Sequence, residues 1–141
     1  MKKKKTQYSQ YYVDVEYNRN FNKRLKTIKG KDEEVIKINC DLILHSRGEN
    51  LDQDNLIAIE MKKSTATRRE KEKDRERLKS LTRQSFDNIW SYDGTSLPEH
   101  VCRYLLGVYY EINITSMQVL IEYYQNGELL YSNIININEL L

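Results

Sequence analysis

The sequence predicts an α/β domain with a mixed β-sheet of about four or five strands and one main crossover helix. Five segments have the apolar alternation and the β-branched and aromatic content that are typical of strands, namely 11–19, 35–46, 55–63, 103–113 and 116–131. One long charged segment, 64–84, follows the third of them and has high helix propensity. The order β, ββ, α, ββ is the pattern of an α/β domain.

The length and the composition favour one soluble domain. The chain has 141 residues, of which 39% are hydrophobic and 31% are charged. Residues 1–10 are expected to be a flexible basic lead, and 11–141 a single domain. No apolar run approaches the roughly 18 residues that span a bilayer, and "MKKKKTQYSQ" has no apolar core of a secretory signal. The two cysteines lack metal-type spacing, which favours the cytoplasm.

The strands 35–46 and 55–63 are expected to form a hairpin through "RGENLDQD" (47–54), whose Gly, Asn and Asp residues favour a turn. Residues 20–34 and 88–100 are expected to be loops. In the helix 64–84, either Ser64 or Thr65 can serve as the N-cap. After a turn at "QNGE" (125–128), the tail is expected to add an edge strand or a short helix.

The hairpin brings ionisable residues together at one end of the sheet. Side chains two apart on a strand share a face, so Glu60 and Lys62 point the same way. Paired residue numbers in an antiparallel hairpin have a nearly constant sum, and the connection centres near Asn50 or Leu51. Asp41 is therefore expected to pair with a residue near Glu60 or Met61.

This cluster has the chemistry of a metal-dependent hydrolase. The carboxylates of Asp41 and Glu60, with the backbone carbonyl of Met61, are hard oxygen ligands suited to Mg²⁺ or Mn²⁺. Such an ion lowers the pKa of a bound water and neutralises phosphate charge. Lys62 is positioned to orient or deprotonate the attacking water. The alternative is an ordinary surface pair of Glu60 and Lys62, which contributes little to stability.

Three segments of the chain, in order, are "VDVEYNRN" (13–20), "CDLILHSRG" (40–48) and "NLIAIEMKKS" (55–64). Their order and spacing resemble the PD-(D/E)XK nuclease superfamily, in particular small bacterial members with an "EYNR", "H-x-R-G" and "E-x-K-K-S" pattern. The segment "DRERLKSLT" (74–82) resembles the helix that follows in that family. The resemblance covers roughly residues 11 to 85. Cys40 replaces the proline that usually precedes the first acidic residue.

The resemblance implies a restriction-endonuclease-like fold in which Asp41 and Glu60 hold the metal ion and Lys62 is the catalytic lysine. Glu16 is a further candidate ligand, either direct or through water. The helix that usually precedes the first strand is missing, which leaves three alternatives: a second copy or another partner chain covers the exposed sheet face, the frame is truncated, or the sheet lacks a layer. The expected activity is Mg²⁺- or Mn²⁺-dependent hydrolysis of phosphodiester bonds in DNA, with RNA as the other candidate substrate.

The charged helix is a candidate nucleic-acid contact. "RREKEKDRERLKSLTR" (68–83) carries eight basic and four acidic residues, whereas the net charge of the whole chain is only +2. The expected contacts are Lys63, Arg68, Arg69 and Arg19. The alternative for this helix is a solvated face with pairs of opposite charge four residues apart. The rival to the enzyme as a whole is a catalytically inactive protein of the same fold that binds nucleic acid or another protein.

Overall fold

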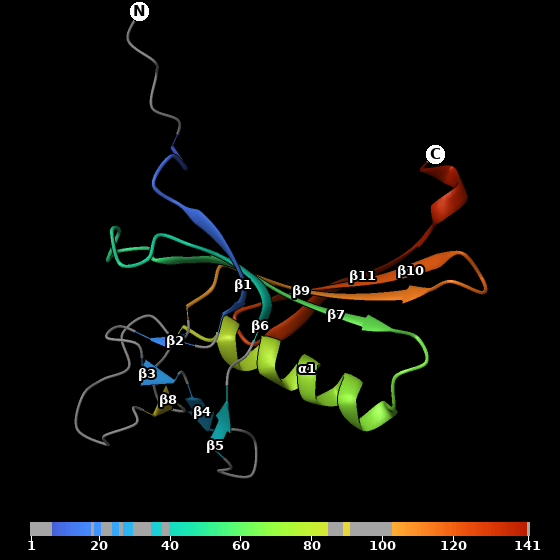
Figure 1. The fold of residues 1–141 in the computed structure, drawn as a ribbon, viewed down its shortest axis with the longest axis horizontal. Helices are drawn as coiled ribbons and strands as arrows, with labels where there is room; N and C mark the ends of the chain where they lie inside the picture. The colour runs from blue at the N-terminus through green and yellow to red at the C-terminus, as the bar shows by residue number, and fades with distance from the viewer. Residues whose placement is uncertain are drawn as a thin grey trace, which may run out of the picture.

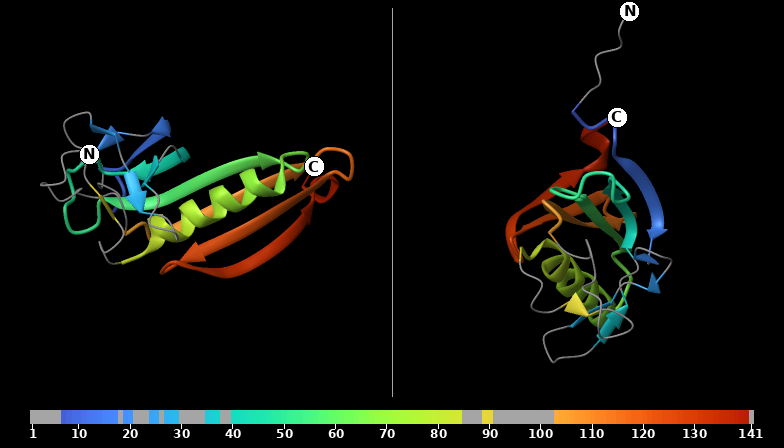
Figure 2. Two further views of the ribbon diagram at one scale, coloured as in Figure 1. Left: turned by 90° about the horizontal axis from the view of Figure 1, so that it is seen from below. Right: turned by 90° about the vertical axis from the view of Figure 1, so that its left-hand side faces the viewer.

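The structure is a computed structural model of the chain. It describes residues 7–17, 19–20, 24–25, 27–29, 35–37, 40–84, 89–90 and 103–140. Within 16–37 and at 89–90 the description covers backbone only. The helix α1 lies along one face of a twisted sheet (Figure 1), and the views in Figure 2 show it running beside β7 and β9. In the part of the chain described, no helix is long and apolar enough to cross a membrane.

The main sheet has six strands in the order β1-β6-β7-β9-β10-β11. They are β1 (Tyr12–Tyr17), β6 (Cys40–His45), β7 (Asn55–Lys63), β9 (Leu106–Asn113), β10 (Gln118–Gln125) and β11 (Glu128–Asn136). Only the β7–β9 pair is parallel, and α1 lies between these two strands in the chain. The prediction of a mixed α/β sheet is therefore confirmed.

The strand count is higher than the predicted four or five because the tail contributes a full edge strand. The chain turns at Asn126 and Gly127, both with positive φ, and returns as β11 beside β10. The 3-10 helix η2 (Ile137–Glu139) then follows. The two alternatives for the tail, an edge strand or a short helix, thus occur one after the other.

The helix α1 (Arg68–Thr82) begins later than the sequence suggested. Thr67 is its N-cap, and Thr67 Oγ1 accepts a hydrogen bond from the backbone N–H of Glu70 at 3.2 Å. Glu70 Oε2 in turn accepts from the backbone N–H of Thr67 at 2.9 Å, which completes a capping box. The predicted N-caps Ser64 and Thr65 are wrong, because the Ser64 N–H extends the sheet by donating to the Ile112 carbonyl.

Short strands occur in the described parts of the two predicted loops, at 20, 24–25, 27–29 and 89–90, and the rest of 20–34 and 88–100 lies outside the described residues. In the segment 20–34, β2 (Arg19–Asn20) pairs with β3 (Arg24–Leu25). A second small sheet has the order β5-β4-β8, formed by β5 (Val35–Lys37), β4 (Thr27–Lys29) and β8 (Ile89–Trp90). The predicted strand 35–46 is therefore two strands, β5 and β6, in different sheets. Strands of two or three residues are too short to have a readable alternation.

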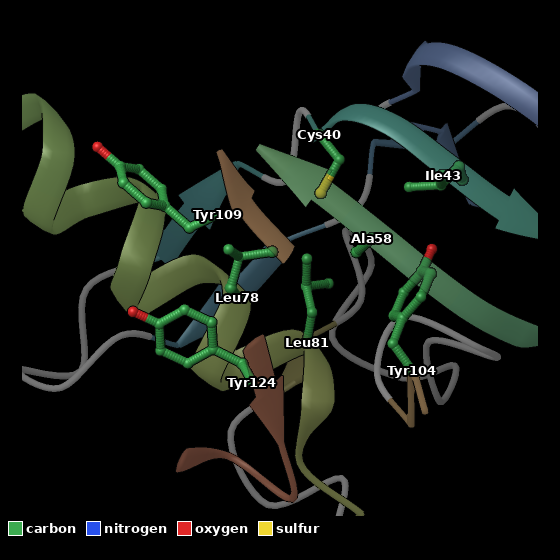
Figure 3. Packing of buried hydrophobic residues seen from close by; sticks show 8 residues of the cluster. All are labelled: Cys40, Ile43, Ala58, Leu78, Leu81, Tyr104, Tyr109 and Tyr124. Carbon is green, nitrogen blue, oxygen red and sulfur yellow. The ribbon is translucent and has the colours of Figure 1, made fainter. Parts of the chain in front are cut away.

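The core lies between α1 and the sheet. Leu78 and Leu81 of α1 point toward Ala58 of β7 and toward tyrosines of β9 and β10 (Figure 3). Among the described residues, the buried cluster consists of Cys40, Ile43, Ala58, Leu78, Leu81, Tyr104, Tyr109 and Tyr124. At Gly107 a Cβ atom would lie 3.1 Å from Cγ2 of Thr82, so the absence of a side chain there lets the end of α1 approach β9 closely.

The other face of the sheet is apolar and partly open. Val13 and Val15 of β1 are 59% and 71% exposed, and Met61 of β7 is 48% exposed. These residues alternate with side chains that face α1, which is the only α-helix among the described residues and lies on the opposite side (Figure 1). Alternation along β1, β6 and β7 thus separates an open apolar face from a helix-covered face that carries both core and ionisable residues.

Candidate functional site

The register of β6 and β7 places Asp41 opposite Glu60. Leu42 pairs with Ile59 in this antiparallel hairpin, so the next position in each strand brings Asp41 and Glu60 together. The backbone N–H of Met61 donates to Asp41 Oδ2 at 2.6 Å, which fixes the Asp41 carboxylate against β7. Opposite residues share a face, as do residues two apart, so Lys62 lies on this face as well. The predicted pairing of Asp41 is confirmed.

Glu60 is a buried carboxyl group, with 1% of its surface exposed. Burial raises the pKa of Glu60 to about 7, although the nearby charge of Arg77 and its hydrogen bond oppose the rise. The negative charges of Asp74 and, to a lesser extent, Asp41 act in the same direction as burial. A buried carboxylate needs a compensating cation, and in this structure α1 provides it.

Two residues of α1 extend the cluster. Arg77 Nη1 donates to Glu60 Oε1 at 2.6 Å and lies 3.2 Å from Asp74 Oδ1. Asp74 Oδ2 in turn lies 3.0 Å from Lys62 Nζ, and Asp74 is only 4% exposed. Burial opposes the charge of Lys62, yet the contact with Asp74 raises its pKa above the ordinary value. A continuous chain of ion pairs therefore runs Glu60–Arg77–Asp74–Lys62.

A second polar group lies beside this chain, on β9 and β10. Glu60 is opposite Tyr109 in β9, and Tyr109 is opposite Glu122 in β10. Arg75 of α1 binds both carboxylate oxygens of Glu122, at 2.8 and 3.0 Å, and its guanidinium lies 4.5 Å from the centre of the Tyr109 ring. This group attaches α1 to β10 and leaves the Asp41–Glu60 position to Arg77.

The H-x-R-G segment has a structural explanation. His45 Nε2 lies 2.6 Å from Asp14 Oδ2, and Arg47 also bonds to the Asp14 carboxylate. The hydrogen bond from Arg47, with that from His45, overcomes partial burial and lowers the pKa of Asp14 to about 2. Arg47 and Gly48 both have positive φ, and the Gly48 N–H donates to Asp54. The segment therefore forms a tight turn and fastens β1 to β6.

The other two predicted metal ligands, Met61 and Glu16, lie next to the Asp41–Glu60 pair, but only the side chain of Met61 is described. Met61 lies between Glu60 and Lys62, with its side chain 48% exposed. Whether its backbone carbonyl binds a metal ion stays a prediction. Glu16 occupies the register position opposite Asp41, because Val15 pairs with Leu42 and Tyr17 with Cys40. The side chain of Glu16 lies outside the described residues.

The predicted nucleic-acid contacts are exposed where they are described. Lys63 ends β7, and Arg68 and Arg69 form the first turn of α1. All three side chains are exposed. Because one short turn connects β7 to α1, these cations lie at the same end of the domain as Lys62. Arg19 lies in β2, and its side chain is outside the described part.

Binding of a divalent ion by Asp41 and Glu60 stays a prediction. Among the residues that the structure describes, no group of three or more His, Cys, Asp or Glu side chains is arranged to hold a metal ion. The chain offers two neighbouring carboxylates, Asp41 and Glu60. Mg²⁺ is commonly held by one or two carboxylates, with water and substrate oxygens completing its shell. Glu60 is already paired with one cation, Arg77, at 2.6 Å.

The sequence analysis missed Asp74 and Arg77, which connect Glu60 to Lys62. Their spacing of three residues is a helical signal, since positions i and i+3 lie on one side of a helix. Counting back from Leu78 and Leu81 places Asp74 on the sheet-facing side, one helical turn before Leu78.

No family model matches this chain, and searches of curated proteins and of solved structures found no match either.

Proposed function

We propose that this protein is a metal-dependent nuclease with a restriction-endonuclease-like fold, which hydrolyses phosphodiester bonds in DNA, with RNA as the other candidate substrate. The observation that carries the proposal is the convergence of Asp41, Glu60 and Lys62 on one face of the β6–β7 hairpin. The resemblance to the PD-(D/E)XK superfamily supports it, because the two carboxylates and the lysine occupy the motif positions.

Each residue has a distinct part in the proposed reaction. Asp41 and Glu60 would hold Mg²⁺ or Mn²⁺, with the Met61 carbonyl and Glu16 as further candidate ligands. A bound ion of this kind would acidify a water and neutralise charge on the scissile phosphate. Lys62 is held as an ammonium while it contacts Asp74, and in that form it would orient the attacking water and balance phosphate charge. It would take up the proton of the water only as a neutral amine that faces the substrate rather than Asp74.

The surroundings support a polyanionic substrate. Lys63, Arg68 and Arg69 are exposed close to the end of β7 and can contact phosphates on either side of the scissile bond. A second copy or a partner chain is proposed to cover the open apolar face around Val13 and Val15. Such a cover would leave the hairpin end and α1 free for nucleic acid, because they belong to the opposite face.

Cleavage assays with matched variants test the proposal. Supercoiled plasmid, linear duplex, single-stranded DNA and RNA are incubated with the chain and either Mg²⁺ or Mn²⁺, with EDTA as the blank. We expect Asp41→Asn, Glu60→Gln and Lys62→Met each to lower the cleavage rate by at least about 100-fold. Lys79→Met, which removes a partly exposed lysine that pairs with Glu76 near the other end of α1, is the control and should retain the wild-type rate.

A second candidate is a non-catalytic protein of this fold that binds nucleic acid or a partner protein. The specific observation in its favour is that Arg77 already pairs with the buried Glu60 carboxylate. Under this candidate, DNA would bind in a salt-dependent manner, and no substrate would be cleaved in Mg²⁺ or Mn²⁺. Cleavage that is unchanged in all three site variants would instead point to a contaminating nuclease and contradict the first candidate.

A further inference from the structure

Asp74 is shared by two cations that come from different elements. Its Oδ1 lies 3.2 Å from Arg77 Nη1 of α1, and its Oδ2 lies 3.0 Å from Lys62 Nζ of β7. Arg77 makes its shorter contact, 2.6 Å, with Glu60. The Asp74 carboxylate therefore joins β7 to α1. If one of the two cations moves away from Asp74, the other can form a closer contact with it.

The charge of the cluster is unbalanced in the direction that favours a further cation. When Glu60 is ionised, Asp41, Glu60 and Asp74 contribute three negative charges and Lys62 and Arg77 two positive charges, so the formal sum is −3 + 2 = −1. A divalent ion changes the sum to +1, and one phosphodiester then brings it to zero. Because Glu60 and Asp74 are buried, a balanced sum matters more here than on an open surface.

The guanidinium of Arg77 is incompletely bonded in its present position. Arg77 Nε is buried and has no hydrogen-bond partner within the described part of the chain. Buried donors without partners are uncommon in folded proteins. A position closer to Asp74 would keep Arg77 paired with a carboxylate, and its contact with Asp74 already exists. Leaving Glu60 therefore does not leave Arg77 without a counter-charge.

We infer that Arg77 and a divalent metal ion are alternative partners of Glu60, and that Arg77 moves onto Asp74 when the ion binds and thereby releases Lys62. This inference rests on the proposed metal site. It adds that Arg77 regulates the site by competing with the ion for Glu60. Arg77 keeps the buried carboxylate compensated in the metal-free protein. Lys62 becomes free to face the substrate only after Arg77 has taken over Asp74, so that metal binding and lysine positioning are coupled.

Calorimetric titration with Mn²⁺ or Mg²⁺ alone, without nucleic acid, tests the competition. Arg77→Gln should bind the ion at least about tenfold more tightly than the wild type, because no charge-assisted hydrogen bond has to be broken first. Arg77→Lys keeps the competing charge and should stay within about threefold of the wild type. Arg75→Gln is the matched control, since Arg75 is the α1 arginine that pairs with Glu122 instead, and it should leave the affinity unchanged.

Unchanged or weaker binding by Arg77→Gln, with a wild type that binds the ion, would overturn the inference and leave the proposed metal site standing. Failure of both proteins to bind would overturn the metal site itself, so the two failures are distinguishable. If Arg77→Gln does not fold, the wild type supplies the second measurement. Acetylation of Lys62, followed by peptide mass spectrometry, should be faster with Mn²⁺ than without it. An equal or slower rate with the ion would contradict the release of Lys62.

Discussion

The buried carboxyl group of Glu60 makes a pH-dependent contribution to stability whose sign and size follow from the structure. Its ordinary pKa is 4.5, and burial raises it to about 7 in the folded chain. The folded state therefore binds more protons than the unfolded state between these values. The contribution is fully favourable below pH 4.5 and is lost as the pH rises through 7. The limiting loss is roughly 3 kcal/mol, since one pKa unit corresponds to about 1.36 kcal/mol.

Glu60→Gln removes this titration and keeps the size of the side chain. Between pH 5 and pH 8, the free energy of unfolding of the wild type should fall by roughly 2–3 kcal/mol more than that of Glu60→Gln. Urea denaturation in EDTA, followed by circular dichroism at each pH, provides both values. EDTA is needed because a bound cation would favour the ionised form of Glu60.

Glu111→Gln is the matched control for this comparison. Burial disfavours the charge of Glu111, but hydrogen bonds from Lys71 and Tyr109 outweigh it and lower the pKa of Glu111. Its stabilisation is therefore lost as the pH falls below the ordinary value, so Glu111→Gln should keep the wild-type slope between pH 5 and pH 8. Equal slopes for the wild type and Glu60→Gln would refute the claim that Glu60 is a desolvated carboxyl group.

Three further variants test other parts of the structure. Leu78→Ala empties a fully buried position between α1 and the sheet and should cost about 2–5 kcal/mol in urea denaturation. Thr67→Ala removes the N-cap acceptor for Glu70 and should cost about 1 kcal/mol, measured in the same way. Asp14→Asn loses the pairing with Arg47, which lowers the Asp14 pKa to about 2. Because Arg47 is exposed and solvent screens the pair, the variant should be about 1 kcal/mol less stable at pH 7. This difference should disappear as the pH falls from 4 to 2.

The hairpin end of the site could be predicted because it depends on local rules. Alternation along a strand has a period of two, and the connection at 47–54 sets which residues face each other. Together these rules place Asp41 beside Glu60 and put Lys62 on the same face, as the structure has them. No knowledge of the rest of the fold is needed for that step.

The contribution of α1 could not be predicted in the same way. Its sequence is dominated by charges, and Leu78 and Leu81 are its only buried aliphatic residues, so the orientation of its first turns depends on tertiary packing. The start of α1 was predictable in principle. Unlike the predicted N-caps Ser64 and Thr65, Thr67 is followed three residues later by glutamate, which is the capping-box pattern.

The short strands between 19 and 37 and at 89–90 were missed for a different reason. Each has two or three residues, and such strands are held by pairing between distant segments rather than by their own pattern. The division of 35–46 into β5 and β6 follows from the same cause, because β5 pairs with β4 whereas β6 pairs with β1 and β7.

The central claim is that the ends of β6 and β7 form a divalent-ion site, and direct binding tests it. Isothermal titration of the metal-free chain with Mn²⁺ is compared with that of Asp41→Asn and of Glu128→Gln, a control on the exposed strand β11. The account predicts one site in the wild type and in Glu128→Gln, with binding lost or at least about tenfold weaker in Asp41→Asn. Equal binding by all three proteins, or none by a folded wild type, would contradict it.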